Sequence, residues 1–185
     1  MNRIFLILAS FALVFMIATM VLGLSLGDLR NPNDTITQRW GTVHRLSGVA
    51  AALSAMFVNG IVATYFVGTS RWCREVSETY SLNRQFIIRS NTLKRRTFPI
   101  TVMSMLAIVA IVALGGAADP GATRQLEPIQ GVTWAQLHLI GAMSGIAFVA
   151  LVFFLQWNNI QSNRQVIDEV MAEVKRIRLE KGLEV

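Results

Sequence analysis

The chain has 185 residues, of which 53% are hydrophobic and 15% charged, whereas about a quarter of the residues in a soluble domain are charged. The apolar residues come in long blocks without charges, which is typical of a membrane protein and excludes an ordinary soluble domain. The formal net charge of +6 would suggest nucleic acid as a partner of a soluble chain. Here the preference of basic residues for the cytoplasmic side of a membrane explains it better, so we expect a lipid bilayer and no nucleic acid.

Residues 4–26 form the first predicted span, because they contain no charged residue and are long enough to cross a hydrocarbon core of about 30 Å. Arg3 ahead of this segment also fits a signal peptide. The apolar part of a signal peptide has only about 7–15 residues, however, and no clear cleavage site follows this longer run. We therefore interpret the segment as an uncleaved span.

Residues 41–68 form the second predicted span, and their many small side chains indicate close contact with another helix or a cofactor. Asn59 lies well inside this span and therefore requires a hydrogen-bond partner. The connection over residues 70–97 carries seven basic and two acidic residues, which places it in the cytoplasm. Its apolar residues favour some helix lying along the membrane surface. We interpret Lys94-Arg95-Arg96 as a topology signal that contacts anionic lipid, with docking of a partner as the alternative.

Residues 98–118 form the third predicted span and residues 133–157 the fourth, which is bracketed by two interfacial tryptophans. The tail, residues 161–185, is charged and favours helix. An apolar stripe along the tail is expected to pack on the cytoplasmic connection or on a neighbouring subunit. The stripe consists of Val166, Val170, Val174 and Ile177.

The sequence thus predicts an all-α fold, a four-helix membrane bundle over residues 1–160 with both termini in the cytoplasm. A basic cytoplasmic loop at residues 70–97 and a helical tail at residues 161–185 complete it. In a bacterium this arrangement corresponds to an inner-membrane protein with its short outer loops facing the periplasm.

The only two histidines of the chain open the second and fourth spans in similar surroundings, Trp40-Gly-Thr-Val-His44 and Trp134-Ala-Gln-Leu-His138. Both spans run in the same direction, so the histidines lie at matching depth near the outer face. The first and third spans both end in glycines. These similarities indicate an internal repeat about an axis along the membrane normal. The glycines are Gly23 and Gly27 in the first span, and Gly115 and Gly116 in the third.

Two neutral imidazoles from parallel helices at one depth can supply both axial ligands of a haem iron. His44 and His138 are therefore the predicted metal ligands of one haem b. Residues without bulk are expected to leave room for the macrocycle beside them. These are Gly48 below the first histidine, Gly141 and Gly145 below the second, and Gly115 and Gly116 from the third span.

Arg45 is placed to pair with a haem propionate, and Arg39 and Arg124 are weaker candidates for the second propionate. Two other readings of the histidines stay open. Each could bind the magnesium of its own chlorophyll-type pigment, or remain hydrated at the interface without a ligand.

These motifs resemble one four-helix half of the heme A synthase family. The similarity rests on His44-Arg45-Leu46 opening one span, on Leu137-His138-Leu139 with Ala142 opening another, and on the Gly115-Gly116 end of the third. It covers the four spans, and it implies that His44 and His138 hold a haem near the outer side.

The chain departs from that family in having one bundle and no cysteine pair in the outer loop. It also lacks the glutamate that precedes the first histidine of the family's catalytic half, since Arg39-Trp40-Gly41-Thr42-Val43 stand there. The resemblance therefore favours a b-type haem bundle and argues against oxidation of the haem itself.

The predicted function is a cytochrome subunit that passes electrons within a larger membrane complex, with other redox subunits and quinol as the expected participants. No acid or second base can be assigned beside the histidines for quinol oxidation, so independent enzymatic activity is not expected. The alternatives are a non-catalytic scaffold or pigment-binding subunit of a respiratory or photosynthetic complex, and an enzyme of haem or lipid metabolism.

Overall fold

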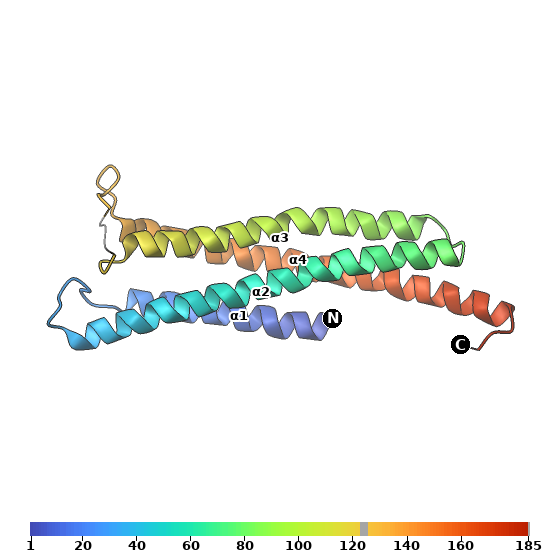
Figure 1. The fold of residues 1–185 in the computed structure, drawn as a ribbon, viewed down its shortest axis with the longest axis horizontal. Helices are drawn as coiled ribbons and strands as arrows, with labels where there is room; N and C mark the ends of the chain where they lie inside the picture. Colours follow the sequence, from blue (N-terminus) through green and yellow to red (C-terminus); the bar gives the residue numbers. More distant parts are fainter. Residues whose placement is uncertain (123–125, 185) are drawn as a thin grey trace.

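The computed structural model describes residues 1–122 and 126–184. Four α-helices lie side by side along one long axis (Figure 1). They are α1 (Asn2–Leu24), α2 (Thr35–Thr79), α3 (Gln85–Ala118) and α4 (Trp134–Glu180). Within the described residues no strand forms, and one isolated bridge joins Ile129 to Val132. The predicted all-α fold with four helices is confirmed.

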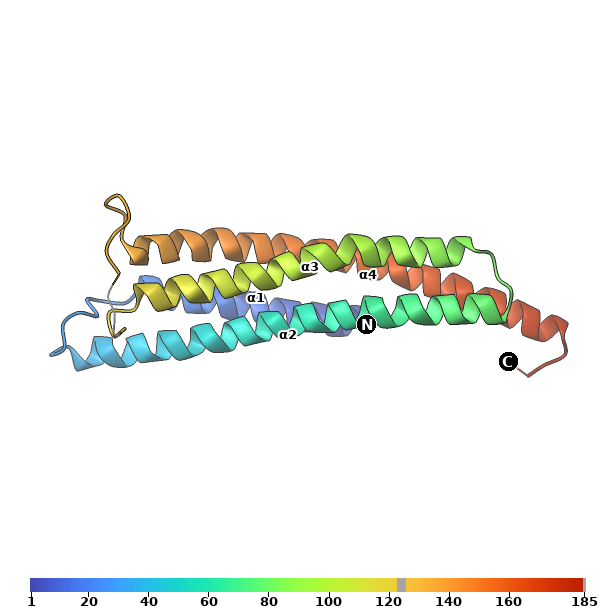
Figure 2. The same ribbon diagram turned by 45° about the horizontal axis from the view of Figure 1, so that its top comes forward.

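Each helix packs against two neighbours around the bundle. The helices α1 and α3 both contact α2 and α4, whereas α2 and α4 lie diagonally opposite and touch far less (Figures 1 and 2). Side chains that project inward from α2 and α4 at the same level therefore meet across the axis of the bundle.

All four helices are long and apolar enough to cross a membrane. Their outer faces expose large apolar side chains; Ile7, Leu46, Leu106 and Phe154 are each at least 58% exposed. A soluble monomer rarely presents apolar surface on this scale. The surface is compatible with the predicted membrane bundle, in which lipid covers these side chains.

Three of the helices are joined by buried polar side chains in the middle of the bundle. Gln156 of α4 donates to Asn59 Oδ1 of α2 and to Thr101 Oγ1 of α3, both at 2.9 Å. Asn59 in turn donates to Ser104 Oγ at 3.2 Å. All four side chains are fully buried. Because unpaired polar groups are costly in hydrocarbon, these bonds fix the axial register of α2, α3 and α4, and they supply the partner that Asn59 requires.

The segment over residues 70–97, expected as a loop with surface-lying helix, is largely a continuation of the spans. The helix α2 runs on to Thr79 and α3 begins at Gln85, so only residues 80–84 connect them. The tail likewise continues α4 to Glu180. These extensions follow the axis of the bundle (Figure 1) and form a three-helix stalk, which we define as residues 69–79, 85–97 and 158–180.

The stalk has its own small core. Val166, Val170 and Val174 of α4 are buried together with Cys73 of α2, as the valine stripe predicts, and Arg89 of α3 pairs with both carboxylate oxygens of Glu169. The stripe therefore draws the basic connection onto α4 rather than leaving it on the membrane surface. Burial also raises the pKa of the Cys73 thiol, which lowers its reactivity.

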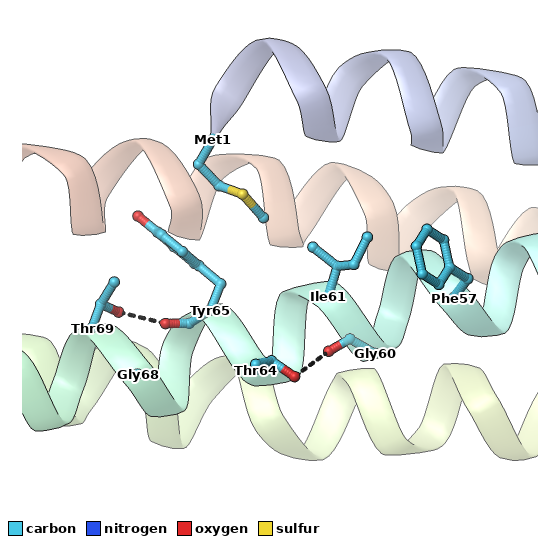
Figure 3. A pocket seen from close by; sticks show the side chains of 8 residues that line it. All are labelled: Met1, Phe57, Gly60, Ile61, Thr64, Tyr65, Gly68 and Thr69. Atoms are coloured by element: carbon cyan, nitrogen blue, oxygen red, sulfur yellow. Dashed lines mark hydrogen bonds between the residues drawn. The ribbon is translucent and has the colours of Figure 1, made fainter.

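A shallow apolar groove of about 650 Å³ lies on α2 beside the start of α1. Gly60, Thr64 and Gly68 form its floor (Figure 3). The hydroxyl of Thr64 donates to the carbonyl of Gly60 at 2.9 Å, so this residue adds little polarity to the floor. Gly60 is sixteen residues from His44 in the same helix, or about 24 Å. The groove is thus an open apolar surface remote from the histidines.

The core of the stalk can be tested through its thiol, since Cys73 is the only cysteine of the chain. We expect a water-soluble maleimide to label native Cys73 slowly. Val170→Ala, which removes a fully buried side chain at a cost of about 2 kcal/mol, should speed labelling severalfold. Met171→Ala is the matched control, because Met171 is 51% exposed. Equal labelling rates for the three proteins would contradict this packing.

Candidate functional site

The two histidines face each other between the diagonal helices. His44 lies in the third turn of α2 and His138 near the start of α4. The centroids of the two imidazole rings are 6.4 Å apart and the ring planes cross at 71°. Both residues are half-buried. The diagonal placement of α2 and α4 is what allows two rings from parallel helices to approach without a helix between them.

Each imidazole packs against a glycine of the preceding helix. A Cβ atom on Gly23 of α1 would lie 2.6 Å from His44 Cε1, and one on Gly115 of α3 would lie 3.0 Å from His138 Cε1. The first separation leaves no room for a side chain on Gly23 unless the ring shifts, and with a side chain on Gly115 the His138 ring would have to yield by a few tenths of an ångström. The glycines therefore allow the Cε1 edge of each ring to approach a neighbouring helix closely, which restricts the orientation of the ring.

A backbone carbonyl orients the first imidazole. His44 Nδ1 lies 3.1 Å from the carbonyl oxygen of Thr19. A carbonyl only accepts hydrogen bonds, so Nδ1 carries the proton of the neutral ring and Nε2 keeps a free lone pair. This is the arrangement found for histidines that bind metals, whose second nitrogen usually donates to a carbonyl or carboxylate.

The second imidazole has corresponding surroundings. His138 Nδ1 is buried, has no hydrogen-bond partner among the described residues, and has the backbone of Ile111 nearby. Ile111 precedes Gly115 by four residues, and Thr19 precedes Gly23 by four. The spacing of four residues thus recurs in α1 and α3, and in each half a histidine of the following helix contacts the glycine. These matching contacts are what the predicted internal repeat leads one to expect.

The other predicted glycines have different surroundings. A Cβ on Gly141 would lie 2.5 Å from Leu114 Cδ1, and one on Gly145 would lie 2.5 Å from Ile111 Cδ1. These two glycines therefore serve the contact between α3 and α4. Gly48 meets only the methyl group of Thr19, at 3.8 Å, and Gly116 meets no atom within 4 Å. Three of the predicted glycines, Gly48, Gly141 and Gly145, lie on the helices that carry the histidines. Of these, only Gly48 has no close neighbour at its missing side chain.

Thr19 and Gly23 are site residues that the sequence reasoning did not assign. Besides its carbonyl, Thr19 contributes a hydroxyl that is buried and has no hydrogen-bond partner. A buried unpaired hydroxyl is costly, so the site offers a polar contact that the described residues do not fill. The repeat itself could have identified Gly23, because it corresponds to Gly115.

Arg45, predicted to bind a propionate, lies at the outer end of the bundle. Its Nη1 donates to Asp119 Oδ1 at 2.9 Å, and the side chains of Arg45 and Asp119 are 42% and 25% exposed. A pair as exposed as this contributes only about 0–1 kcal/mol, so it is readily exchanged for another partner. Arg39 is exposed in the first turns of α2, and Arg124 lies outside the described residues.

Residues 1–122 and 126–184 contain no group of three or more histidine, cysteine, aspartate or glutamate side chains that could hold a metal ion. Comparisons with models of known protein families, with curated proteins and with solved structures find no match for this chain.

The close contacts at the two glycines give different expectations for alanine substitutions. Gly23→Ala should destabilise the detergent-solubilised protein by about 1–3 kcal/mol, because its Cβ would overlap the His44 ring. Gly115→Ala should have a smaller effect, since its contact is longer. Gly116→Ala is the control and should be neutral or slightly stabilising, because its Cβ would enter open space. Thermal unfolding would check this order, and equal effects at all three glycines would contradict the packing described.

Proposed function

We propose that this chain is a b-type cytochrome subunit of a membrane electron-transfer complex and holds one haem between His44 and His138. The observation that carries the proposal is the distance between the two imidazoles. A metal-bound imidazole nitrogen lies about 2.0 Å from the metal, and the ring centroid about 1.1 Å further, so two rings on opposite sides of one ion have centroids about 6.2 Å apart. The centroids of His44 and His138 are 6.4 Å apart.

The same distance argues against two separate pigments. If each histidine bound its own metal, two macrocycles would have to stack between the rings. At a van der Waals contact of about 3.5 Å between them, the imidazole centroids would be about 10 Å apart. The observed 6.4 Å suits one metal and one macrocycle.

The chain's own residues would determine how such a group is held. The Thr19 carbonyl keeps the proton of His44 on Nδ1 and so leaves Nε2 free to coordinate. Gly23 and Gly115 fix the two rings, and two histidine ligands leave no open coordination position for substrate. A bound haem supplies reversible one-electron chemistry. These features favour electron transfer within an assembly over a reaction at the iron.

The absorption spectrum of the purified protein provides the main test. We expect a Soret band and a dithionite-reducible alpha band typical of two histidine ligands. His44→Gly and His138→Gly should each abolish this spectrum, and added imidazole should restore it in part, because it can occupy the space of the missing ring. A preparation without haem, made by cells with ample haem supply, would contradict the proposal and favour a scaffold. Far-red absorption would favour pigment.

We further propose that the protein lies in a bacterial inner membrane with the stalk and both termini in the cytoplasm. The seven basic residues over residues 70–97 support this orientation through the positive-inside rule. The histidines, at the opposite end of the bundle from the stalk, then lie toward the periplasm.

Single cysteines in a Cys73→Ser background test the orientation. Asn33 and Gln85 are exposed at opposite ends of the bundle. We expect Asn33→Cys to react with an impermeant maleimide in intact spheroplasts. Gln85→Cys should react only after the membrane is opened. The reverse pattern would show the opposite orientation.

A further inference from the structure

A polar hollow of about 590 Å³ lies at the outer end of the bundle, where the loop after α1 meets the loop after α3. Arg30 lines it from the first loop, Gln38 and Arg45 from the first turns of α2, and Gly121 from the loop after α3. His44 and Arg45 are consecutive residues of α2, so the hollow adjoins the helical turn that carries the first imidazole.

The wall formed by the first loop is firmly attached to α2. Gln38 Nε2 donates to the carbonyl of Leu29 at 2.7 Å and to that of Asn31 at 3.2 Å. The Leu29 side chain packs over Gly41, where a Cβ would lie 2.5 Å from Leu29 Cδ2. Arg30 is thus carried by a loop that is held in place before any ligand arrives, which reduces the entropy lost on binding.

The charge of the hollow is positive and only partly compensated. Asp119 accepts from Arg45 Nη1 and also from the backbone amide of Gly121, at 2.9 Å. Asp119 therefore keeps a hydrogen bond if Arg45 moves to another partner. No carboxylate within residues 1–122 and 126–184 forms an ion pair with Arg30. Guanidinium groups bind carboxylates through paired hydrogen bonds, so carboxylate is the ligand chemistry that the hollow fits.

The two halves of the repeat differ at this point. Leu139 follows His138 where Arg45 follows His44, so only the first half presents an arginine beside its imidazole. A macrocycle between the histidines would consequently have one electrostatically preferred direction for an acidic edge, toward α2 and the loop after α1.

Resting on the proposed haem site, we infer that this hollow binds the two haem propionates. Arg45 exchanges Asp119 for one propionate, and Arg30 contacts the other. Arg30 is thereby assigned as a cofactor-binding residue, in place of Arg39, which does not line the hollow.

The test compares haem b with its dimethyl ester, which has the same iron and ring but no carboxylates. The full-length apoprotein in detergent is titrated with each, and binding is followed by the bis-histidine spectrum. We expect the wild type to bind haem b about tenfold more tightly than the ester, as for one strong charge-assisted contact. Arg30→Gln and Arg45→Gln should each reduce this preference severalfold while leaving the affinity for the ester unchanged.

Two further variants sharpen the result. Arg39→Gln is the matched control and should keep the full preference, because Arg39 does not line the hollow. Asp119→Asn should increase the affinity for haem b, since it removes the competing carboxylate. Each variant is compared through its ester affinity, which reports an intact histidine pair independently of the arginines.

The outcomes separate this inference from the proposed function. If neither haem b nor the ester gives a bis-histidine spectrum, the haem site itself is refuted. If both bind equally well to the wild type, the haem site stands and the assignment of the hollow is wrong. Loss of preference in Arg39→Gln but not in Arg30→Gln would also overturn the assignment.

Discussion

The contact between an imidazole and a glycine backbone is the constraint on which the site depends. It occurs once in each half of the bundle, His44 on Gly23 and His138 on Gly115. Because each ring lies against the neighbouring helix, that helix restricts its position. The distance of 6.4 Å between the rings is thus a property of helix packing, set by α1 and α3 as much as by the helices that carry the histidines.

The buried polar side chains in the middle of the bundle also help to fix the distance between the two imidazoles. Gln156, Asn59 and Thr101 join α4, α2 and α3 by hydrogen bonds that tolerate little axial sliding. A slip of one residue would shift a helix by about 1.5 Å and separate the two rings accordingly. In a bilayer, where apolar side chains gain little from leaving lipid for the protein interior, such directional bonds are the main source of register. The polar contacts in the middle of the bundle therefore help to align the helices at the end that carries the histidines.

Much of this arrangement can be predicted from the sequence, and the exceptions have physical reasons. The first span, expected at residues 4–26, is α1 (Asn2–Leu24), because a charge-free apolar run is an unambiguous signal. The packing of residues 70–97 into the stalk is not predictable from hydropathy. Their spaced apolar side chains suit a membrane surface and a packed stalk equally well, and only the folded tail, with Val166 and Val170 facing them, decides between the two.

At the site, the histidines stand out by rarity and matched surroundings, but the role of a glycine depends on which helix lies opposite it. Gly141 is near His138 in sequence, yet it faces Leu114. Gly23, which is distant from His44 in sequence, lies under its ring. Sequence spacing shows which residues share one face of a helix. It does not show which residues of another helix pack against that face. The partner of Arg45 is likewise a long-range contact, with Asp119 in the other half of the chain.

The length of α2 has a consequence for how the protein can be reached. Its 45 residues extend about 68 Å, more than twice the roughly 30 Å of a hydrocarbon core. In the membrane orientation proposed above, this surplus places the far end of the stalk beyond the lipid headgroups. In that orientation, a water-soluble protein is able to bind the sides of the stalk without contacting the bilayer. Such a protein would contact α2, the same continuous helix that carries His44 near its other end.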